Sequence, residues 1–258
     1  ATSTHILNSM ANAVQGASDI ATKPIQVGLD VARAGATGGE REIFMSELPA
    51  QVRGAFEGLL TGFRNAGTVM QTGISPMQLG KLEQIRPGFQ SGSGKVDFAM
   101  EMPLRMLQAA DEVFRGSARG AHIRALAERE AVKSVPLGGK ASKEERVQFV
   151  MDHLADFPQL LDAADKAAGR AVLQESRGVT NAALRLRESI PVAGEVVVPF
   201  LRTPLNIFLQ GLDYSGVGYA RAIKAAQAGR TTEATEDISR AILGNGIIAV
   251  GGLLGYYG

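Results

Sequence analysis

The chain has 258 residues, a length that predicts one or two domains at roughly 150 residues each. Its 27 basic and 26 acidic side chains nearly cancel, which disfavours a globally basic nucleic-acid binder but not a local basic patch. The absence of cysteine excludes disulfides, cysteine-ligated zinc, iron–sulfur clusters and thiol nucleophiles. Only His5, His122 and His153 remain for a histidine metal site or a Ser-His-Asp triad.

Aromatic residues are few, at 10 Phe, 4 Tyr and no Trp, whereas glycine reaches 31. Small residues let backbones approach closely but bury little apolar area each, so we expect thin helical layers or partner surfaces instead of one thick core. No signal-peptide pattern follows Ala1. The sequence ends at Gly258 within an apolar stretch, and we therefore expect it to be a piece of a longer polypeptide.

Apolar residues at helical spacing dominate the N-terminal part of the chain, residues 1–94. They predict a helical stretch over about 4–34, which Gly16 and Pro24 interrupt, then a Gly-rich break at 35–39 and a second helical stretch over about 40–71. Residues 72–94 contain five glycines and two prolines and are expected to form a long connection. A connection of that length is unusual inside a compact domain, and we expect it to bridge subdomains or to lie along a partner.

The central part, residues 95–178, begins with the strongest predicted helix, over about 96–133. Its apolar stripe predicts packing against another helix and consists of Met100, Leu104, Leu107, Phe114, Ala118, Ala121 and Ala125. The charged side chains of this helix, such as Glu112 and Arg115, lie mostly off the stripe. Residues 142–145 then form a Ser-x-x-Glu capping box, which predicts the start of a short helix, and a further helix is expected to reach about residue 177.

The C-terminal part, residues 179–258, contains one strand-like passage at 190–199, interpreted as an extended buried connector. A structural turn and helix cap are expected from Pro199, Thr203, Pro204 and Asn206. The remaining predicted helices cover about 204–213, 216–228 and 232–250. The predicted fold class is therefore all-α, an extended multi-helix array with Gly/Pro-rich connectors and no sizeable sheet.

Two glycine-containing runs partly match known nucleotide-binding motifs, but neither meets the full requirements of its motif. The run from Gly88 to Lys95 resembles a phosphate loop, but its spacing is one residue too long and Val96 replaces the required Ser or Thr. The glycines 244 and 246 fit a loose dinucleotide pattern, but a helical stretch precedes them where a strand is needed. No two histidines share a helical face at metal-ligand spacing. We therefore expect no enzyme, no catalytic residue, no cofactor and no metal.

Two surfaces are candidates for contact with other molecules. The first is a modestly basic segment whose side chains are candidates for contact with phosphates or anionic lipid. The alternative is an ordinary solvated helical face. The candidate residues are Arg185, Arg187, Arg202, Arg221 and Lys224. The second is the uncharged stretch 241–258, where a Gly-x-x-x-Gly spacing favours close helix contact and two tyrosines suit a membrane interface.

The candidate oligomer or membrane contacts in this second stretch are Ile242, Ile247, Val250, Gly251, Leu254, Gly255, Tyr256 and Tyr257. At 18 residues the stretch is close to the roughly 20 that a bilayer span needs, although Asn245 and six glycines weaken insertion. One alternative is a buried core or subunit-packing helix. Another is a conditional membrane segment, which is buried in one state and inserted in the other.

Two passages carry a family resemblance, namely residues 110–131 and residues 198–215 followed by a polar helix and the glycine-rich apolar end. One contains an Ala-Asp-Glu phrase that starts at Ala110. The other contains a Pro-Phe-x-x-Thr-Pro-x-Asn phrase that starts at Pro199. In this order they resemble the very large internal virion proteins of tailed bacteriophages, also called ejection, inner-core or large polyvalent proteins. The resemblance covers about residues 95–258.

The resemblance implies a helical, non-enzymatic region of a long multidomain chain that is packaged in the virion interior. Such proteins associate with themselves, with portal or tail proteins and with other ejection proteins. They leave ahead of the genome and form a conduit across the host envelope, which places double-stranded DNA and the host periplasm and inner membrane among the expected contacts. The alternative is a membrane-active, pore-forming helical module unrelated to phage, and an enzyme is the third hypothesis.

Overall fold

The computed structural model describes residues 2–77, 94–133, 141–172, 208 and 211–257. Helices account for most of these residues, and no strand occurs among them, so the predicted all-α class is confirmed. The chain forms two compact units that interleave along the sequence. The first comprises Ala1–Gly16 and Pro49–Val172, and the second comprises Ala17–Leu48 and Leu173–Gly258. The two units therefore differ from the three consecutive parts used in the sequence analysis, residues 1–94, 95–178 and 179–258.

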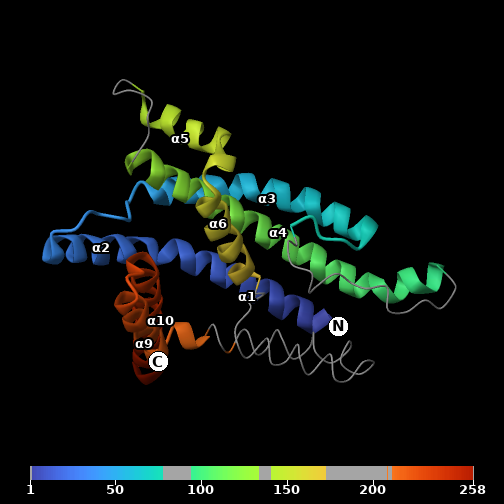
Figure 1. Cartoon of the computed structure of the whole chain (residues 1–258). Coiled ribbons are helices and arrows are strands. Elements are labelled where there is room, and N and C mark those ends of the chain that lie inside the picture. The colour runs from blue at the N-terminus through green and yellow to red at the C-terminus, as the bar shows by residue number, and fades with distance from the viewer. Residues whose placement is uncertain (1, 78–93, 134–140, 173–207, 209–210, 258) are drawn as a thin grey trace. The chain divides into compact units, whose positions relative to one another are not determined.

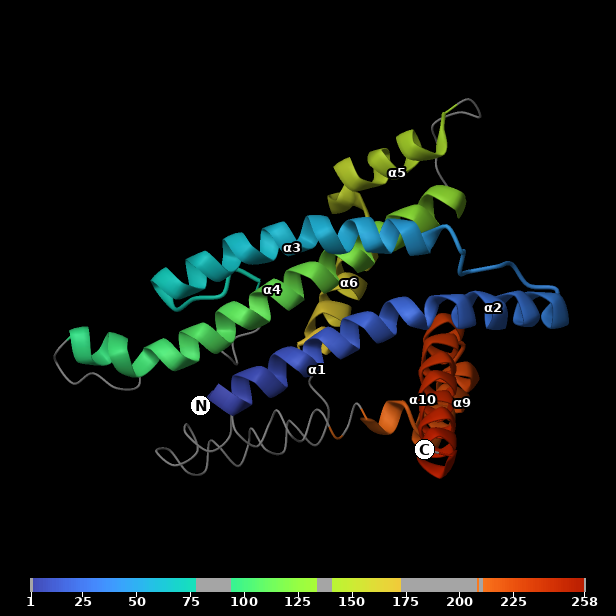
Figure 2. The same ribbon diagram turned by 180° about the vertical axis from the view of Figure 1, so that it is seen from behind.

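The first unit is built on the long helix α4 (Gly94–Lys133). Helix α3 (Glu47–Thr72) runs antiparallel beside it in both views (Figures 1 and 2). Helices α5 (Lys143–Asp152) and α6 (Pro158–Ala171) also pack on α4, and the short 3-10 helix η2 (Leu154–Asp156) joins them. Helix α1 (Thr2–Ala21) contributes its residues up to Gly16.

One cluster of buried apolar side chains in the first unit lies where the C-terminal end of α4 meets α5 and α6. Its buried members are Ala127, Ala131, Val147, Val150 and Leu160. The predicted capping box starts α5 as expected, since the Ser142 hydroxyl accepts from the Glu145 amide at 3.2 Å. The Glu145 carboxylate accepts from the Ser142 amide at 2.6 Å.

The second unit contains α2 (Lys23–Thr37), α9 (Gly216–Gln227) and α10 (Thr231–Tyr257). Helices α9 and α10 form a hairpin that turns at Gly229, whose φ of 73° is in the left-handed region that glycine adopts without strain. Its core is a small alanine cluster at Ala222, Ala225 and Ala234, against which Ile238 packs.

Several predicted boundaries shift. The expected stretch over 4–34 divides at Thr22, because Pro24 occupies the first turn of α2, where its missing N–H costs no hydrogen bond. The interruption predicted at Gly16 is wrong, since this glycine lies within the continuous helix α1. Helix α3 begins only at Glu47, so the expected helix over 40–71 loses its first turns to a loop. Helix α10 reaches Tyr257, beyond the predicted end at 250. The connector predicted at 190–199 lies outside the described residues.

Candidate interaction surfaces

Helices α3 and α4 meet through glycines. Gly54, Gly58 and Gly62 lie on one face of α3, and Gly116 and Gly120 lie opposite on α4. A Cβ atom added to Gly116 would lie 2.6 Å from the Gly58 carbonyl oxygen and 2.7 Å from the Gly62 Cα atom. The backbones of the two helices are therefore in direct contact, and any side chain at these positions forces them apart.

The opposite face of α3 carries large apolar side chains that nothing in the described structure covers. This outer face consists of Val52, Phe56, Leu60 and Phe63, of which Phe56 is 67% exposed and Phe63 is 59% exposed. At about 200 Å² for a phenylalanine side chain, these two residues alone leave roughly 250 Å² of apolar surface in water. Contiguous patches of roughly 300–600 Å² on a monomer often have a function, so the outer face is a candidate interaction surface.

A buried polar network occupies the middle of α4, where the sequence predicted side chains off the packing stripe. Glu112 is 1% exposed and Arg115 is 6% exposed, whereas Phe114 of the predicted stripe is only half-buried. Arg115 Nη1 donates to Glu112 Oε1 at 2.8 Å, and the Ser75 hydroxyl donates to the same oxygen. The network holds the loop that follows α3 against α4, and Arg105 adds hydrogen bonds to the last carbonyls of α3 at 3.0 and 3.2 Å.

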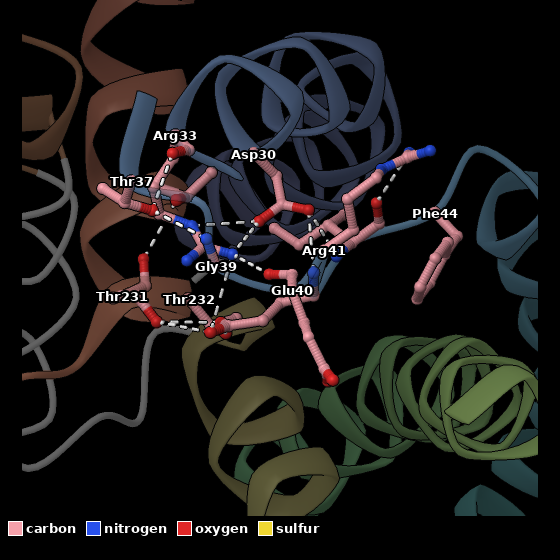
Figure 3. Close-up of polar contacts among 12 residues, drawn as sticks. Asp30, Arg33, Thr37, Gly39, Glu40, Arg41, Phe44, Thr231 and Thr232 are labelled. Carbon is pink, nitrogen blue, oxygen red and sulfur yellow. Dashed lines mark hydrogen bonds and ion pairs between the residues drawn. The ribbon is translucent and has the colours of Figure 1, made fainter. Parts of the chain in front are cut away.

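In the second unit, the buried carboxylate of Asp30 organises the loop between α2 and α3 (Figure 3). One of its oxygens accepts from the amides of Glu42 and Ile43 at 2.8 and 3.0 Å, and the other accepts from Arg33 at 2.8 Å. Burial raises the pKa of Asp30, but the hydrogen bonds from Ile43, Arg33 and Glu42 outweigh it, so the pKa lies below its usual value. Asp30 therefore stays charged in the folded protein at neutral pH.

The same loop is joined to the start of α10 by Glu42. The hydroxyls of Thr231 and Thr232, the first residues of α10, donate to its carboxylate at distances down to 2.6 Å (Figure 3). A negative charge at a helix N-terminus is stabilised by the helix dipole. Asp30, Arg33 and Glu42 thus connect α2, the loop and α10 within the second unit.

A second buried charge cluster lies around Arg240 of α10, whose side chain is 6% exposed. Asp19, Glu236 and Asp237 lie 3.5–3.6 Å from its guanidinium nitrogens. Burial raises the pKa of Asp237 above its usual value, despite the opposing charges of Arg221 and Arg240. Arg221, a predicted phosphate or lipid contact, pairs within the protein with Asp213 and with Asp237.

Lys224 and the predicted contact residues of α10 also lie within the described part of the chain. Lys224 is exposed on α9. In α10, Ile242, Ile247, Val250 and Leu254 are exposed, and Leu254 reaches 69% exposure. From Asn245 onward every described side chain of α10 is exposed, on all sides of the helix, and Gly251, Gly255, Tyr256 and Tyr257 belong to the same helix.

The remaining predicted residues lie outside the part that the structure describes: Arg185, Arg187, Pro199, Arg202, Thr203, Pro204 and Asn206. None of the described helices is long and apolar enough to cross a bilayer. Within the described ranges, no group of three or more acidic or histidine side chains is arranged to hold a metal ion. The glycines rejected as a dinucleotide motif lie within α10, where a Cβ on Gly244 would collide with the backbone of Tyr214.

The glycine contact between α3 and α4 was not predicted, although its signal is present in the sequence. Glycines recur every four residues at 54, 58 and 62, and again at 116 and 120, a spacing that places them on one helix face. The outer face of α3 was not identified as a surface either, because its apolar residues also fit a core-facing stripe.

The chain was compared with protein-family models, with curated proteins and with solved structures, and no match was found in any of the three.

Proposed function

We propose that this chain is a structural and translocation segment of a bacteriophage ejection protein. In this proposal it acts without catalysis, associates with copies of itself and with portal or tail proteins, and helps to form the conduit that delivers the genome across the host envelope. It would reside in the virion interior and pass to the host periplasm and inner membrane on infection. The resemblance of residues 95–258 to this class of proteins supports the proposal.

The observation that carries the proposal is the exposed apolar surface of α3 and α10. Two helices of the same chain leave large apolar side chains in water, at Phe56 and Phe63 in one and at Ile247 and Leu254 in the other. Such surfaces are costly in an isolated protein and are typical of proteins that work inside an assembly. Most of the buried apolar residues are alanines, which bury little apolar area each, and this suits helices that separate and repack during transport.

The proposal is tested on the native source of the chain. Intact mass spectrometry of purified phage particles should find these residues in a polypeptide longer than 258 residues, and symmetry-averaged imaging should place that polypeptide on the portal or tail axis. A free protein of 27.1 kDa that is absent from particles would overturn the proposal.

A second candidate function is a membrane-active, pore-forming helical module unrelated to phage. The described end of α10 favours it, because the helix is uncharged from Ala241 onward and its described side chains are exposed on all sides from Asn245 onward. Dye release from anionic vesicles decides between the two. Leakage that Val250→Asp abolishes, from a chain that is not part of a particle, would support the pore former. Assembly without leakage would support the ejection protein.

A further inference from the structure

We propose that Asp237 is a proton-binding site and that the proton it binds holds helix α10 in its docked position within the second unit. The site belongs to the charge cluster around Arg240, which joins α10 to α9 and to the end of α1. This inference goes beyond the proposed function and does not depend on it, because it concerns how one helix of the chain is held. It rests on the burial and hydrogen bonding of Asp237, on the charges that surround it and on the two unlike halves of α10.

The surroundings of Asp237 are poor for a charged carboxylate. The residue is 3% exposed, and within the described part of the chain no group donates a hydrogen bond to it. Arg240 Nη1 lies 3.5 Å from Oδ1 and Arg221 Nε lies 3.7 Å from Oδ2, and both distances exceed that of an ordinary hydrogen bond. Asp30, which is buried as deeply in the same unit, accepts hydrogen bonds from two amides and from Arg33. A buried carboxylate that lacks hydrogen bonds is costly to ionise, so Asp237 keeps a proton to a higher pH than a carboxylate in water does.

Both arginines near Asp237 are shared with other carboxylates. Arg221 also pairs with Asp213, and Arg240 lies 3.6 Å from Asp19 and from Glu236. Neither cation is therefore available to Asp237 alone. Within the described residues, the titratable and charged groups that face Asp237 and Arg240 are Asp19 of α1, Asp213 and Tyr214 of the segment before α9, Arg221 of α9, and Glu233 and Glu236 of α10.

Helix α2 also packs on α10, but it supplies no further cation to Asp237. Its basic residues are engaged elsewhere, since Lys23 pairs with Glu47 at 3.1 Å and Arg33 pairs with Asp30 at 2.8 Å. Burial is therefore the main influence on the Asp237 carboxyl, and the two shared arginines compensate for it only in part.

The direction of the pH effect follows from this burial. In the folded chain, burial and the like charges of Asp213 and Glu233 raise the pKa of Asp237 against the opposing charges of Arg221 and Arg240. When α10 leaves the unit, Asp237 faces water and its pKa returns to about 4. The docked helix binds the proton more tightly, so docking is strongest when Asp237 is protonated. Docking weakens as the pH rises from about 4 to the raised pKa, and it is constant above that pKa.

The two halves of α10 differ in a way that gives this proton an effect. The first half, residues 231–241, is held mainly by hydroxyl and charged side chains, and its buried apolar members are Ala234 and Ala241. Undocking it exposes little apolar area, so one buried charge is a large part of the balance. From Asn245 onward the helix is uncharged and its described side chains are exposed. Loss of the proton loosens the polar half and so frees the helix that carries this apolar end.

The absence of cysteine allows a direct measurement of how often α10 opens. Ser239→Cys introduces one thiol, in a side chain of similar size, at a residue that is 0% exposed. Labelling of this thiol by dithiodipyridine, which reacts in mild acid as well as at neutral pH, requires α10 to open. The labelling rate is divided by the rate for the urea-unfolded chain at the same pH, so that thiol ionisation cancels and the opening constant remains.

The decisive quantity is the opening constant of Ser239→Cys divided by that of the same variant with Asp237→Asn. This ratio cancels the effect of every other titrating group. We expect it to rise by roughly threefold or more between about pH 4.5 and about pH 8, because only aspartate loses a proton in that range. Asp162→Asn, the same substitution at an exposed carboxylate on α6, should give a ratio that does not change with pH. A ratio for Asp237→Asn that is constant or falls with pH would overturn the proposal.

Carboxyl NMR titration of the unmodified chain tests the proton itself and does not depend on the cysteine variants. The Asp237 resonance, assigned by its loss in Asp237→Asn, should titrate above the value of about 4 that an aspartate has in water. Circular dichroism at each pH confirms that the chain stays folded during the titration. A pKa at or below the value in water would overturn the proposal, whatever the labelling rates show.

Discussion

The glycine contact between α3 and α4 predicts opposite effects for the same substitution at two positions of one helix. At Gly58, a Cβ would lie 2.9 Å from the carbonyl carbon of Gly116 and closer still to its oxygen, whereas ordinary contacts begin at 3.4 Å. At Gly67, a Cβ meets nothing within 4 Å. Alanine should therefore disrupt packing at the first position and only improve helix propensity at the second.

The magnitudes follow from these two environments. Alanine in place of glycine within a helix gains about 1 kcal/mol, which is the whole expected effect of Gly67→Ala. Overpacking costs about 1–3 kcal/mol, and the upper end applies to Gly58→Ala because the clash is with backbone, which no rotamer change relieves. The net loss for Gly58→Ala is then about 2 kcal/mol, and the two variants differ by about 3 kcal/mol.

Thermal unfolding followed by circular dichroism measures this difference. At roughly 2–4 °C per kcal/mol for a chain of this size, the melting temperatures of the two variants should differ by roughly 6–12 °C, with Gly58→Ala the lower. Hydrogen exchange should be faster in α3 and α4 for Gly58→Ala, and no faster than in the unmodified chain for Gly67→Ala. Equal stability of the two variants would mean that the helix backbones are not in contact and would refute the reasoning.

Three further predictions concern charges and caps. The pKa of Asp30 is lowered in the folded protein, so its stabilisation is present above the unfolded value of about 4 and is lost as pH falls through the folded pKa. Asp30→Asn should therefore lower the free energy of unfolding at pH 7 by about 1.5–3 kcal/mol and flatten the acid limb of the pH–stability curve. The pKa of Asp237 is raised, so its charged form destabilises the fold above that pKa, and acidification from there towards pH 4 removes the penalty. Asp237→Asn should raise stability at pH 7 and remove this pH dependence, and a loss of stability in urea unfolding would contradict the assignment. Ser142→Ala removes one arm of the capping box of α5 and should cost about 1 kcal/mol in the same assay, while Ser142→Asp should retain most of the stability.

Local signals in the sequence predicted the helices well. The capping box at Ser142 and the proline at the start of α2 gave element boundaries, because both act through hydrogen bonds of the first helical turn. The glycines at 35–39 indicated a break after α2, but the extension of the loop to the start of α3 was missed, since its geometry depends on Asp30, which lies 12 residues before Glu42 and binds its amide. Contacts of this kind are tertiary and leave no periodic pattern.

The burial of the charged side chains in α4 could not be predicted from the sequence either. A pattern analysis places Glu112 and Arg115 on the solvent side of α4, because isolated charges are rarely buried. The two side chains lie three residues apart and pair through one carboxylate oxygen of Glu112, to which Ser75 from another segment also donates. Mutual pairing of this kind offsets part of the penalty for burying each charge, but the arrangement becomes visible only when the position of Ser75 is known.

Helix α3 shows why the candidate interaction surfaces could be predicted only in part. The end of α10 is identifiable from its lack of charge alone, whereas α3 carries charges and apolar residues in the proportions of an ordinary amphipathic helix. The usual inference turns the large apolar residues inward. In α3 the glycines face inward, because two backbones in contact leave no room for a side chain, and Phe56 and Phe63 face outward as a consequence. A helix with glycines at every fourth position on one face and large apolar residues on the other has two faces suited to contact. The face with large side chains is the one left for another molecule.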